Sequence, residues 1–172
     1  MYFNGFALRD EEHFFDAILD RGAYTLSGFS YGAIEAFRAA QRSTKRVDRL
    51  QLISPAFFQA KSEKYKRLQL IGYKKESGAY LAKFTENCFS PYALQELNYR
   101  EHDAGELEDL LRYEWKMKEL QALAESGTQI EVYLGGEDRI TDVQAAYAFF
   151  LPFATVTLIK GANHFLQGEQ DE

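Results

Sequence analysis

The 172-residue sequence contains one cysteine, three prolines and no apolar run long enough to cross a bilayer. Its single cysteine, Cys88, excludes an internal disulfide, and no spacing of Cys and His typical of a metal site occurs. We therefore expect neither a metal nor a cofactor. Hydrophobic residues make up 46% of the chain and aromatic residues 15%, which excludes a disordered or low-complexity protein. The composition predicts one globular domain over residues 1–172.

A secretion signal and an excess of positive charge are also missing. The N-terminal stretch MYFNGFALRDEEHFF lacks a basic start followed by an apolar core and a cleavage site, so we expect a cytoplasmic protein without a membrane partner. The formal net charge of −6 disfavours nucleic acid as a partner, because phosphate binding requires a concentrated basic surface.

Positive charge is nevertheless concentrated in residues 61–83. This segment holds seven basic residues and two acidic ones, so seven minus two gives it a net charge of +5. It is either the solvated face of a helix or a surface that attracts an acidic partner. The basic residues are Lys61, Lys64, Lys66, Arg67, Lys74, Lys75 and Lys83, and the acidic ones are Glu63 and Glu76.

Hydrophobic spacing predicts that strands and helices alternate over most of the chain. The expected strands are 1–3, 23–28, 49–55, 128–138 and 154–164, and the expected helices between them are 10–22, 31–43 and 141–153. This alternation indicates an α/β fold with a mostly parallel sheet of about five strands and helices on both faces.

Residues 56–126 interrupt this alternation. They contain no convincing strand and have helical periodicity, with one helix broken at Gly72 and the longest helix expected over 104–127. An insertion of this length between the third and fourth strands is far longer than an ordinary crossover connection. We expect it to form a helical lid over the carboxyl ends of the strands, where ligands bind in such sheets.

Residues 28–32, Gly-Phe-Ser-Tyr-Gly, match the pattern Gly-x-Ser-x-Gly. In this motif the serine sits on a sharp strand-to-helix turn, where a side chain in place of either glycine would clash. The alternative is an ordinary tight connection, but the position between an apolar strand and an alanine-rich helix favours Ser30 as a nucleophile.

A serine nucleophile requires a histidine base and an orienting carboxylate, in the chain order serine, acid, histidine. His164, directly after the last predicted strand, satisfies this order. His13 and His102 do not, and we expect both to be solvated surface residues.

The carboxylate is expected in the loop after the fourth strand, which offers Glu137, Asp138 and Asp142. Asp138 is the best placed, a few residues after the glycine pair, whereas Asp142 is typical of a helix cap. Spacing alone leaves the choice between these two aspartates open.

Two backbone amides are expected to bind the oxyanion of a tetrahedral intermediate. One belongs to Tyr31, the residue after the nucleophile. The other belongs to Phe6, in the Asn-Gly-Phe loop after the first strand.

The whole chain resembles a trimmed α/β-hydrolase in which several of the usual early strands are missing, and Asn4-Gly5 replaces the usual His-Gly. The segments NGF, SGFSYGAI, LISPAFF, KYKRLQL, IEVYLGGEDRITD and NHFLQ resemble more closely the short BioV-type pimeloyl-acyl carrier protein methyl ester esterases of biotin synthesis. This resemblance extends over nearly the full length.

The resemblance implies hydrolysis of the methyl ester at the far end of a pimeloyl chain that is still linked to its carrier protein, with release of methanol. Ser30 would attack the ester carbonyl, His164 would accept and return the proton, and Asp138 would orient the imidazole. The amides of Phe6 and Tyr31 would hold the oxyanion.

The implied partner is an acyl carrier protein that bears the pimeloyl methyl ester on phosphopantetheine, and the basic segment is its candidate docking surface. The residues expected to bind the carrier are Lys64, Lys66, Arg67, Lys74 and Lys75. Two other functions remain open: a general carboxylesterase or acyl-carrier thioesterase, and a non-catalytic binding protein with a hydrolase fold.

Overall fold

Five strands form one parallel sheet in the computed structural model, which describes residues 1–169. The strands are β1 (Tyr2–Phe3), β3 (Thr25–Phe29), β4 (Arg49–Ile53), β6 (Gln129–Gly135) and β7 (Thr155–Ile159). They pair in the order β1-β3-β4-β6-β7, each parallel to its neighbour. The predicted five-stranded parallel sheet is confirmed.

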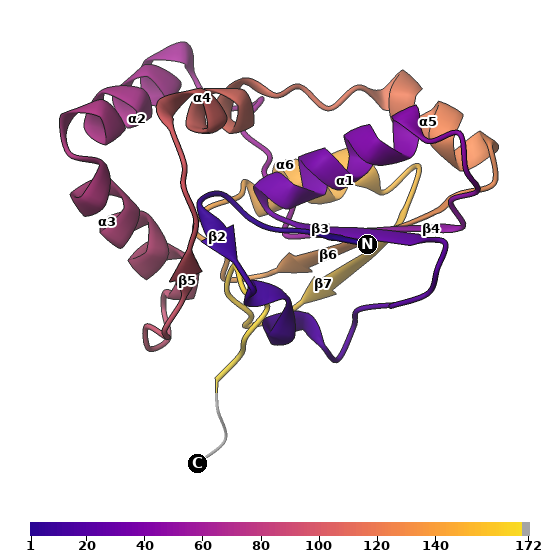
Figure 1. Ribbon diagram of the computed structural model, residues 1–172, viewed down its shortest axis with the longest axis horizontal. Helices are drawn as coiled ribbons and strands as arrows, with labels where there is room; N and C mark the ends of the chain where they lie inside the picture. Colours follow the sequence, from indigo (N-terminus) through magenta and orange to yellow (C-terminus); the bar gives the residue numbers. More distant parts are fainter. Residues whose placement is uncertain (170–172) are drawn as a thin grey trace.

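Helices α1 (Tyr31–Arg42) and α6 (Val143–Phe150) pack on one face of the sheet, and α5 (Met117–Glu125) lies on the same side (Figure 1). Their apolar faces meet the buried side chains of the central strands. The core residues at this contact include Ile34, Phe37, Leu50, Leu52, Val132, Leu134 and Phe150, each no more than 1% exposed.

The opposite face carries only a short 3-10 helix, η1 (Glu11–Phe15), together with the chain that leads to β3. The helix predicted over 10–22 is therefore wrong. Asp10 has a left-handed backbone (φ 61°) and makes no capping bond through its side chain, so it does not start an α-helix. Phe14 and Phe15 instead turn toward the core, where Phe15 packs against Phe29 with ring centroids 4.9 Å apart.

Three helices stand beyond the carboxyl ends of the strands: α2 (Glu63–Lys75), α3 (Ser77–Phe89) and α4 (Ala104–Arg112) (Figure 1). We use the term lid helices for these three. Helix α5 also belongs to the 56–126 segment, but it lies beside the end of α1 at the far end of the sheet.

Three predictions within the 56–126 segment are wrong: the long helix, the absence of a strand and the break at Gly72. The expected long helix over 104–127 is split into α4 and α5, because the chain is extended at Tyr113 and buries Trp115 between Phe37 and Phe150. The segment also contains a strand, β5 (Asn98–Tyr99), which pairs antiparallel with β2 (Leu8–Arg9). Strands of two residues are too short to give a periodic signal.

Helix α2 runs through Gly72 without the predicted break. Its N-terminus is fixed by Ser62, whose hydroxyl accepts a hydrogen bond from the Tyr65 amide at 3.1 Å. In the described part of the chain, residues 1–169, no helix is both long and apolar enough to span a membrane.

Because α2 is continuous, Gly72→Ala should raise the free energy of unfolding by about 0.5–1 kcal/mol, the usual difference between glycine and alanine inside a helix. A Cβ at this position would meet only the Tyr80 ring, at 3.6 Å. Urea denaturation measures the change. Gly127→Ala is the matched control with the opposite expected sign, since Gly127 has φ +98°. A destabilised Gly72→Ala protein would contradict a continuous α2.

Candidate active site

The turn between β3 and α1 holds Ser30 in a strained conformation, with φ 55° and ψ −113°. A Cβ on Gly28 would overlap the carbonyl of Gly32, and a Cβ on Gly32 would overlap the carbonyl of Phe3. Only glycine therefore fits at either position. The backbone of Ser30 is anchored on both sides, because its amide donates to Ile53 at 2.9 Å and its carbonyl accepts from Ala33 at 3.1 Å.

Ser30, His164 and Asp138 are brought together although they lie far apart in the sequence. The Ser30 Oγ is 3.0 Å from His164 Nε2, and His164 Nδ1 is 2.7 Å from Asp138 Oδ2. The side chains of His164 and Asp138 are completely buried. This is the geometry in which an imidazole can take a proton from a serine hydroxyl while a carboxylate fixes its tautomer.

The loops that carry the histidine and the acid are held by their own hydrogen bonds. Asp138 Oδ1 accepts from the amides of Ile140 at 2.7 Å and Thr141 at 3.1 Å. The Ser54 hydroxyl donates to the carbonyl of His164 at 2.7 Å. Both carboxylate oxygens of Asp138 are therefore engaged, and the histidine is held by its backbone as well as its ring.

Of the two aspartates that spacing left open, Asp138 is the one bonded to His164. Asp142 caps α6, where its side chain accepts a hydrogen bond from the Ala145 amide at 3.2 Å. His13 is exposed, as expected. His102 is half-buried rather than solvated: its Nδ1 is 2.7 Å from the Tyr73 hydroxyl and its ring packs against Phe6.

The two predicted oxyanion amides belong to Phe6 and Tyr31. Within residues 1–169, neither N–H donates to a backbone or side-chain acceptor. Phe6 is 1% exposed and lies under the lid helices, in contact with Tyr73 and Phe84. Both amides therefore lack an acceptor among the described residues.

The side chain of Tyr31 has a contact that the sequence did not indicate. Its hydroxyl donates to Asp109 Oδ2 of α4 at 2.8 Å, and Arg38 of α1 holds the same carboxylate through two bonds of 2.6 and 2.8 Å. These bonds, above all those from Arg38, lower the pKa of Asp109, while burial raises the pKa of Tyr31. A partly exposed ionic contact thus ties α4 to the helix that follows the nucleophile.

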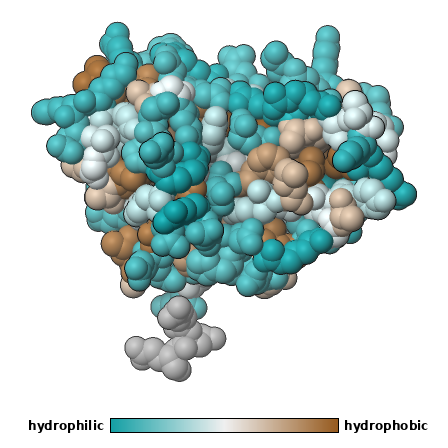
Figure 2. Space-filling model, viewed as in Figure 1, coloured by the Kyte–Doolittle hydropathy of each residue, from teal (hydrophilic) through white to brown (hydrophobic). Residues whose placement is uncertain are grey.

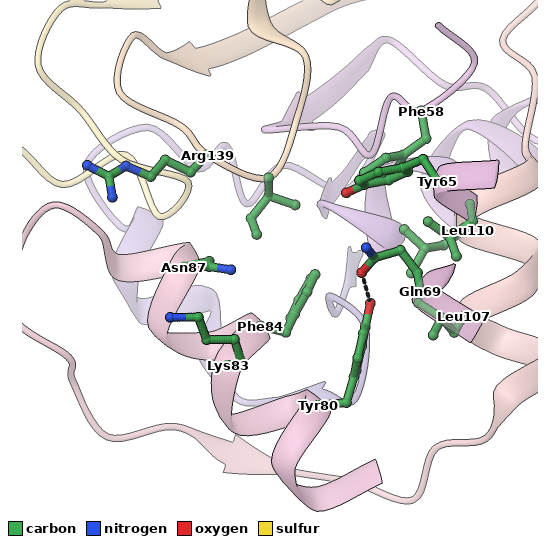
Figure 3. Close-up of a pocket in the computed structure, with 12 residues that line it drawn as sticks. Phe58, Tyr65, Gln69, Tyr80, Lys83, Phe84, Asn87, Leu107, Leu110 and Arg139 are labelled. Carbon is green, nitrogen blue, oxygen red and sulfur yellow. Dashed lines mark hydrogen bonds between the residues drawn. The ribbon is translucent and has the colours of Figure 1, made fainter. Parts of the chain in front are cut away.

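A cavity of about 150 Å³ lies between the lid helices and the loop after β6 (Figure 3). Its walls combine apolar and aromatic side chains with polar ones, and Asn87 points its amide into the cavity while the guanidinium of Arg139 points away. The residues that line it include Phe58, Tyr65, Tyr80, Phe84, Leu107, Leu110 and Ile140. None of the twelve lining residues belongs to the triad, and Ser30 itself is only 2% exposed.

Four of the five predicted carrier-binding residues are exposed on the lid: Lys64, Arg67, Lys74 and Lys75. Lys66 is not one of them. Its side chain is 8% exposed and its ammonium group lies 3.6 Å from Glu63, because position 66 falls on the inward face of α2. This removes Lys66 from the candidate docking surface. In the described residues, no group of three His, Cys, Asp or Glu side chains is arranged to hold a metal ion.

Comparison with solved structures identifies the fold. BioG from Haemophilus influenzae matches with a TM-score of 0.63 at 14% identity, over 96% of this chain and 87% of that one. MenH from S. aureus matches with a TM-score of 0.60 at 12% identity, over 95% and 85%. No protein-family model and no curated protein matches the sequence.

Longer proteins match as well, and the chain spans little more than half of their length. A bromoperoxidase from Bacillus anthracis (TM-score 0.63, 18% identity) is covered over 60% of its chain, and naproxen esterase from Bacillus subtilis (0.55, 16%) over 53%. The two matches cover 82% and 83% of the present chain, respectively. The protein has the α/β-hydrolase fold in a trimmed form.

The contact between Asp109, Arg38 and Tyr31 should stabilise the fold measurably. We expect Asp109→Asn to lower the free energy of unfolding by about 1 kcal/mol at pH 7, after allowing for partial exposure to solvent. The folded pKa of Asp109 lies below its ordinary 3.8, so the contribution is complete above about pH 4 and is lost as pH falls further.

Urea denaturation of wild type and variant between pH 7 and pH 3.5 measures both effects. Glu108→Gln is the control, because Glu108 lies on the same helix but makes only an exposed ion pair with Arg112. A stability difference that widens on acidification would contradict this account.

Proposed function

We propose that the protein is a serine esterase that forms an acyl-enzyme on Ser30. The observation that carries this proposal is the continuous chain of hydrogen bonds from Ser30 through His164 to Asp138. His164 removes the hydroxyl proton as Ser30 attacks the ester carbonyl, and the oxyanion is held by the Phe6 and Tyr31 amides.

The rest of the cycle uses the same groups. The imidazolium of His164 gives its proton to the departing alkoxide, which leaves as an alcohol, and a tetrahedral centre collapses to the acyl-enzyme. His164 then removes a proton from water, which attacks the acyl carbonyl and releases the acid. Because Ser30 is 2% exposed, an ester reaches it only when neighbouring side chains move aside.

The substrate proposed here is the methyl ester of a pimeloyl chain bound to acyl carrier protein, a step of biotin synthesis. The resemblance of the sequence motifs to such esterases is the main support. The cavity between the lid helices and the β6 loop adds to it, since its leucine and aromatic side chains offer contacts suited to methylene groups. The matched solved structures include proteins described as esterases.

The outer face of α2 is the proposed docking surface for the carrier protein. Two exposed apolar side chains, Leu68 and Ile71, each 53% exposed, lie among its cations. Figure 2 shows hydrophobic atoms among hydrophilic ones in the upper left region, where Figure 1 places α2. The cationic residues are Lys64, Arg67, Lys74 and Lys75. Such a surface attracts an acidic protein and the phosphate of its phosphopantetheine.

Ser30→Ala should abolish hydrolysis of p-nitrophenyl butyrate and labelling by a fluorophosphonate probe, since only the hydroxyl can form the covalent adduct. A loss of activity by at least about 10⁴-fold is expected from the removal of a triad nucleophile. Ser77→Ala, an exposed serine at the start of α3, is the control. An unlabelled wild type would favour a non-catalytic binding protein.

Charge reversal on α2 tests whether this helix binds the carrier protein. The double variant Lys64→Glu, Arg67→Glu should raise KM for the carrier-bound methyl ester by about tenfold and leave p-nitrophenyl butyrate hydrolysis unchanged. Lys116→Glu with Lys118→Glu, beside α5, makes the same charge change away from the lid. Equal loss on both substrates would contradict carrier docking, and cleavage of the thioester in place of the methyl ester would identify a thioesterase.

A further inference from the structure

The Phe6 amide lies in a turn formed by residues 5–8. The backbone polar groups of Gly5 and Ala7, on either side of Phe6, all make hydrogen bonds. The Gly5 carbonyl accepts from the Leu8 amide at 3.1 Å, which closes the turn, and from Arg100 at 3.4 Å. The Ala7 carbonyl accepts from the Arg100 amide at 2.9 Å. Ala7 has φ 61°, a left-handed conformation that an alanine adopts only when its surroundings impose it.

Carboxylates hold the two remaining amides on either side of Phe6. The Gly5 N–H donates to Glu11 Oε1 at 2.7 Å, and the Ala7 N–H donates to Glu106 Oε1 at 3.4 Å. Glu106 comes from lid helix α4 and is paired with Arg100 through both of its oxygens. The amide of Phe6, between these two, has no acceptor in residues 1–169.

Glu11 is an unusual residue to bury. It is 1% exposed, and Oε1 also accepts a hydrogen bond from the Tyr2 hydroxyl at 3.1 Å. Its other oxygen, Oε2, is buried without a partner in the described part of the chain. Burial raises the pKa of Glu11, and the bond from Gly5 opposes that rise. An apolar side chain would avoid the cost of this buried carboxylate, so stability alone does not explain it.

The turn that Glu11 holds lies next to the nucleophile turn. The chain just before it passes against the nucleophile turn, where Gly32 leaves no room for a side chain beside Phe3 and Asn4. A trans peptide points its C=O and N–H in opposite directions. The Gly5 carbonyl and the Phe6 N–H belong to the same peptide group. Because the carbonyl is held toward Leu8 and Arg100, the Phe6 N–H is held pointing away from them.

We propose that Glu11 and Glu106 are positioning residues that clamp the Gly5–Leu8 turn from opposite sides, so that the Phe6 amide is held ready for the oxyanion. Glu11 acts from the sheet side and Glu106 from the lid side. Neither touches the substrate. The inference rests on the proposed serine-esterase function but not on the identity of the natural ester.

Glu11→Leu tests the clamp, because leucine has no acceptor for the Gly5 amide. With p-nitrophenyl butyrate, kcat should fall by about 100-fold with KM nearly unchanged, the effect of losing one oxyanion donor. The inhibition constant of a trifluoromethyl ketone, which forms a tetrahedral oxyanion on the serine, should rise by a similar factor. Glu11→Gln keeps an acceptor oxygen and should recover most of the activity.

Glu12→Leu is the matched control, since it makes the same substitution at the next residue, which contacts only Arg21. Titration of active sites with diethyl p-nitrophenyl phosphate, together with circular dichroism, corrects for misfolded protein. A folded Glu11→Leu protein with wild-type kcat and unchanged inhibitor binding would overturn the inference.

If Glu11→Leu does not fold, Glu106→Gln carries the test. It weakens the lid-side bond and should lower kcat by about tenfold without changing KM. Wild-type kcat in a folded Glu106→Gln protein would then overturn the inference. A wild type that neither hydrolyses the ester nor reacts with the phosphate ester would overturn the proposed function, and the clamp with it.

Discussion

Close backbone packing at Gly28 and Gly32 is the constraint on which the site depends. The absence of side chains there lets β3, α1 and the end of β1 approach more closely than a Cβ would permit. This approach has two consequences. Ser30 is forced into a left-handed conformation at the tip of the turn, and the Asn4–Ala7 segment is brought beside it. The nucleophile and one candidate oxyanion donor are thus placed by the same packing.

Partly buried ion pairs lie where the lid meets this turn. Asp109 binds Arg38 and the Tyr31 hydroxyl, and Glu106 binds Arg100 and the Ala7 amide. Both carboxylates come from α4. This one lid helix therefore contacts both Tyr31, which follows the nucleophile, and Ala7, in the turn that carries the Phe6 amide. Ionic contacts of this kind contribute little net stability but require a specific geometry. They give α4 a fixed position relative to the core, in contrast to the outer face of α2.

The sequence predicted the features that depend on a local pattern of residues. It did not predict contacts between residues that are far apart in the chain. The strands, the Gly-x-Ser-x-Gly turn and the order of serine, acid and histidine are local or ordered features, and these led to Ser30, Asp138 and His164. The contact of Asp109 with Arg38 joins residues 71 positions apart, and no spacing rule anticipates it. Lys66 was predicted to be a surface cation, and the burial of Glu11 was not predicted, because burial depends on tertiary packing.

In the proposed function, the lid separates two tasks that a single surface would perform poorly. Recognition of an acidic partner requires exposed, hydrated cations, whereas oxyanion stabilisation requires fixed amides in a dry site. Helix α2 presents its cations to solvent, and α4 turns its carboxylates inward to the turn and the nucleophile helix. Because the carboxylates of α4 are already neutralised by Arg38 and Arg100, they do not oppose an oxyanion at the Phe6 amide with unpaired negative charge. Glu11 differs from these two carboxylates, because neutral donors, the Gly5 amide and the Tyr2 hydroxyl, hold it in place of an ion pair.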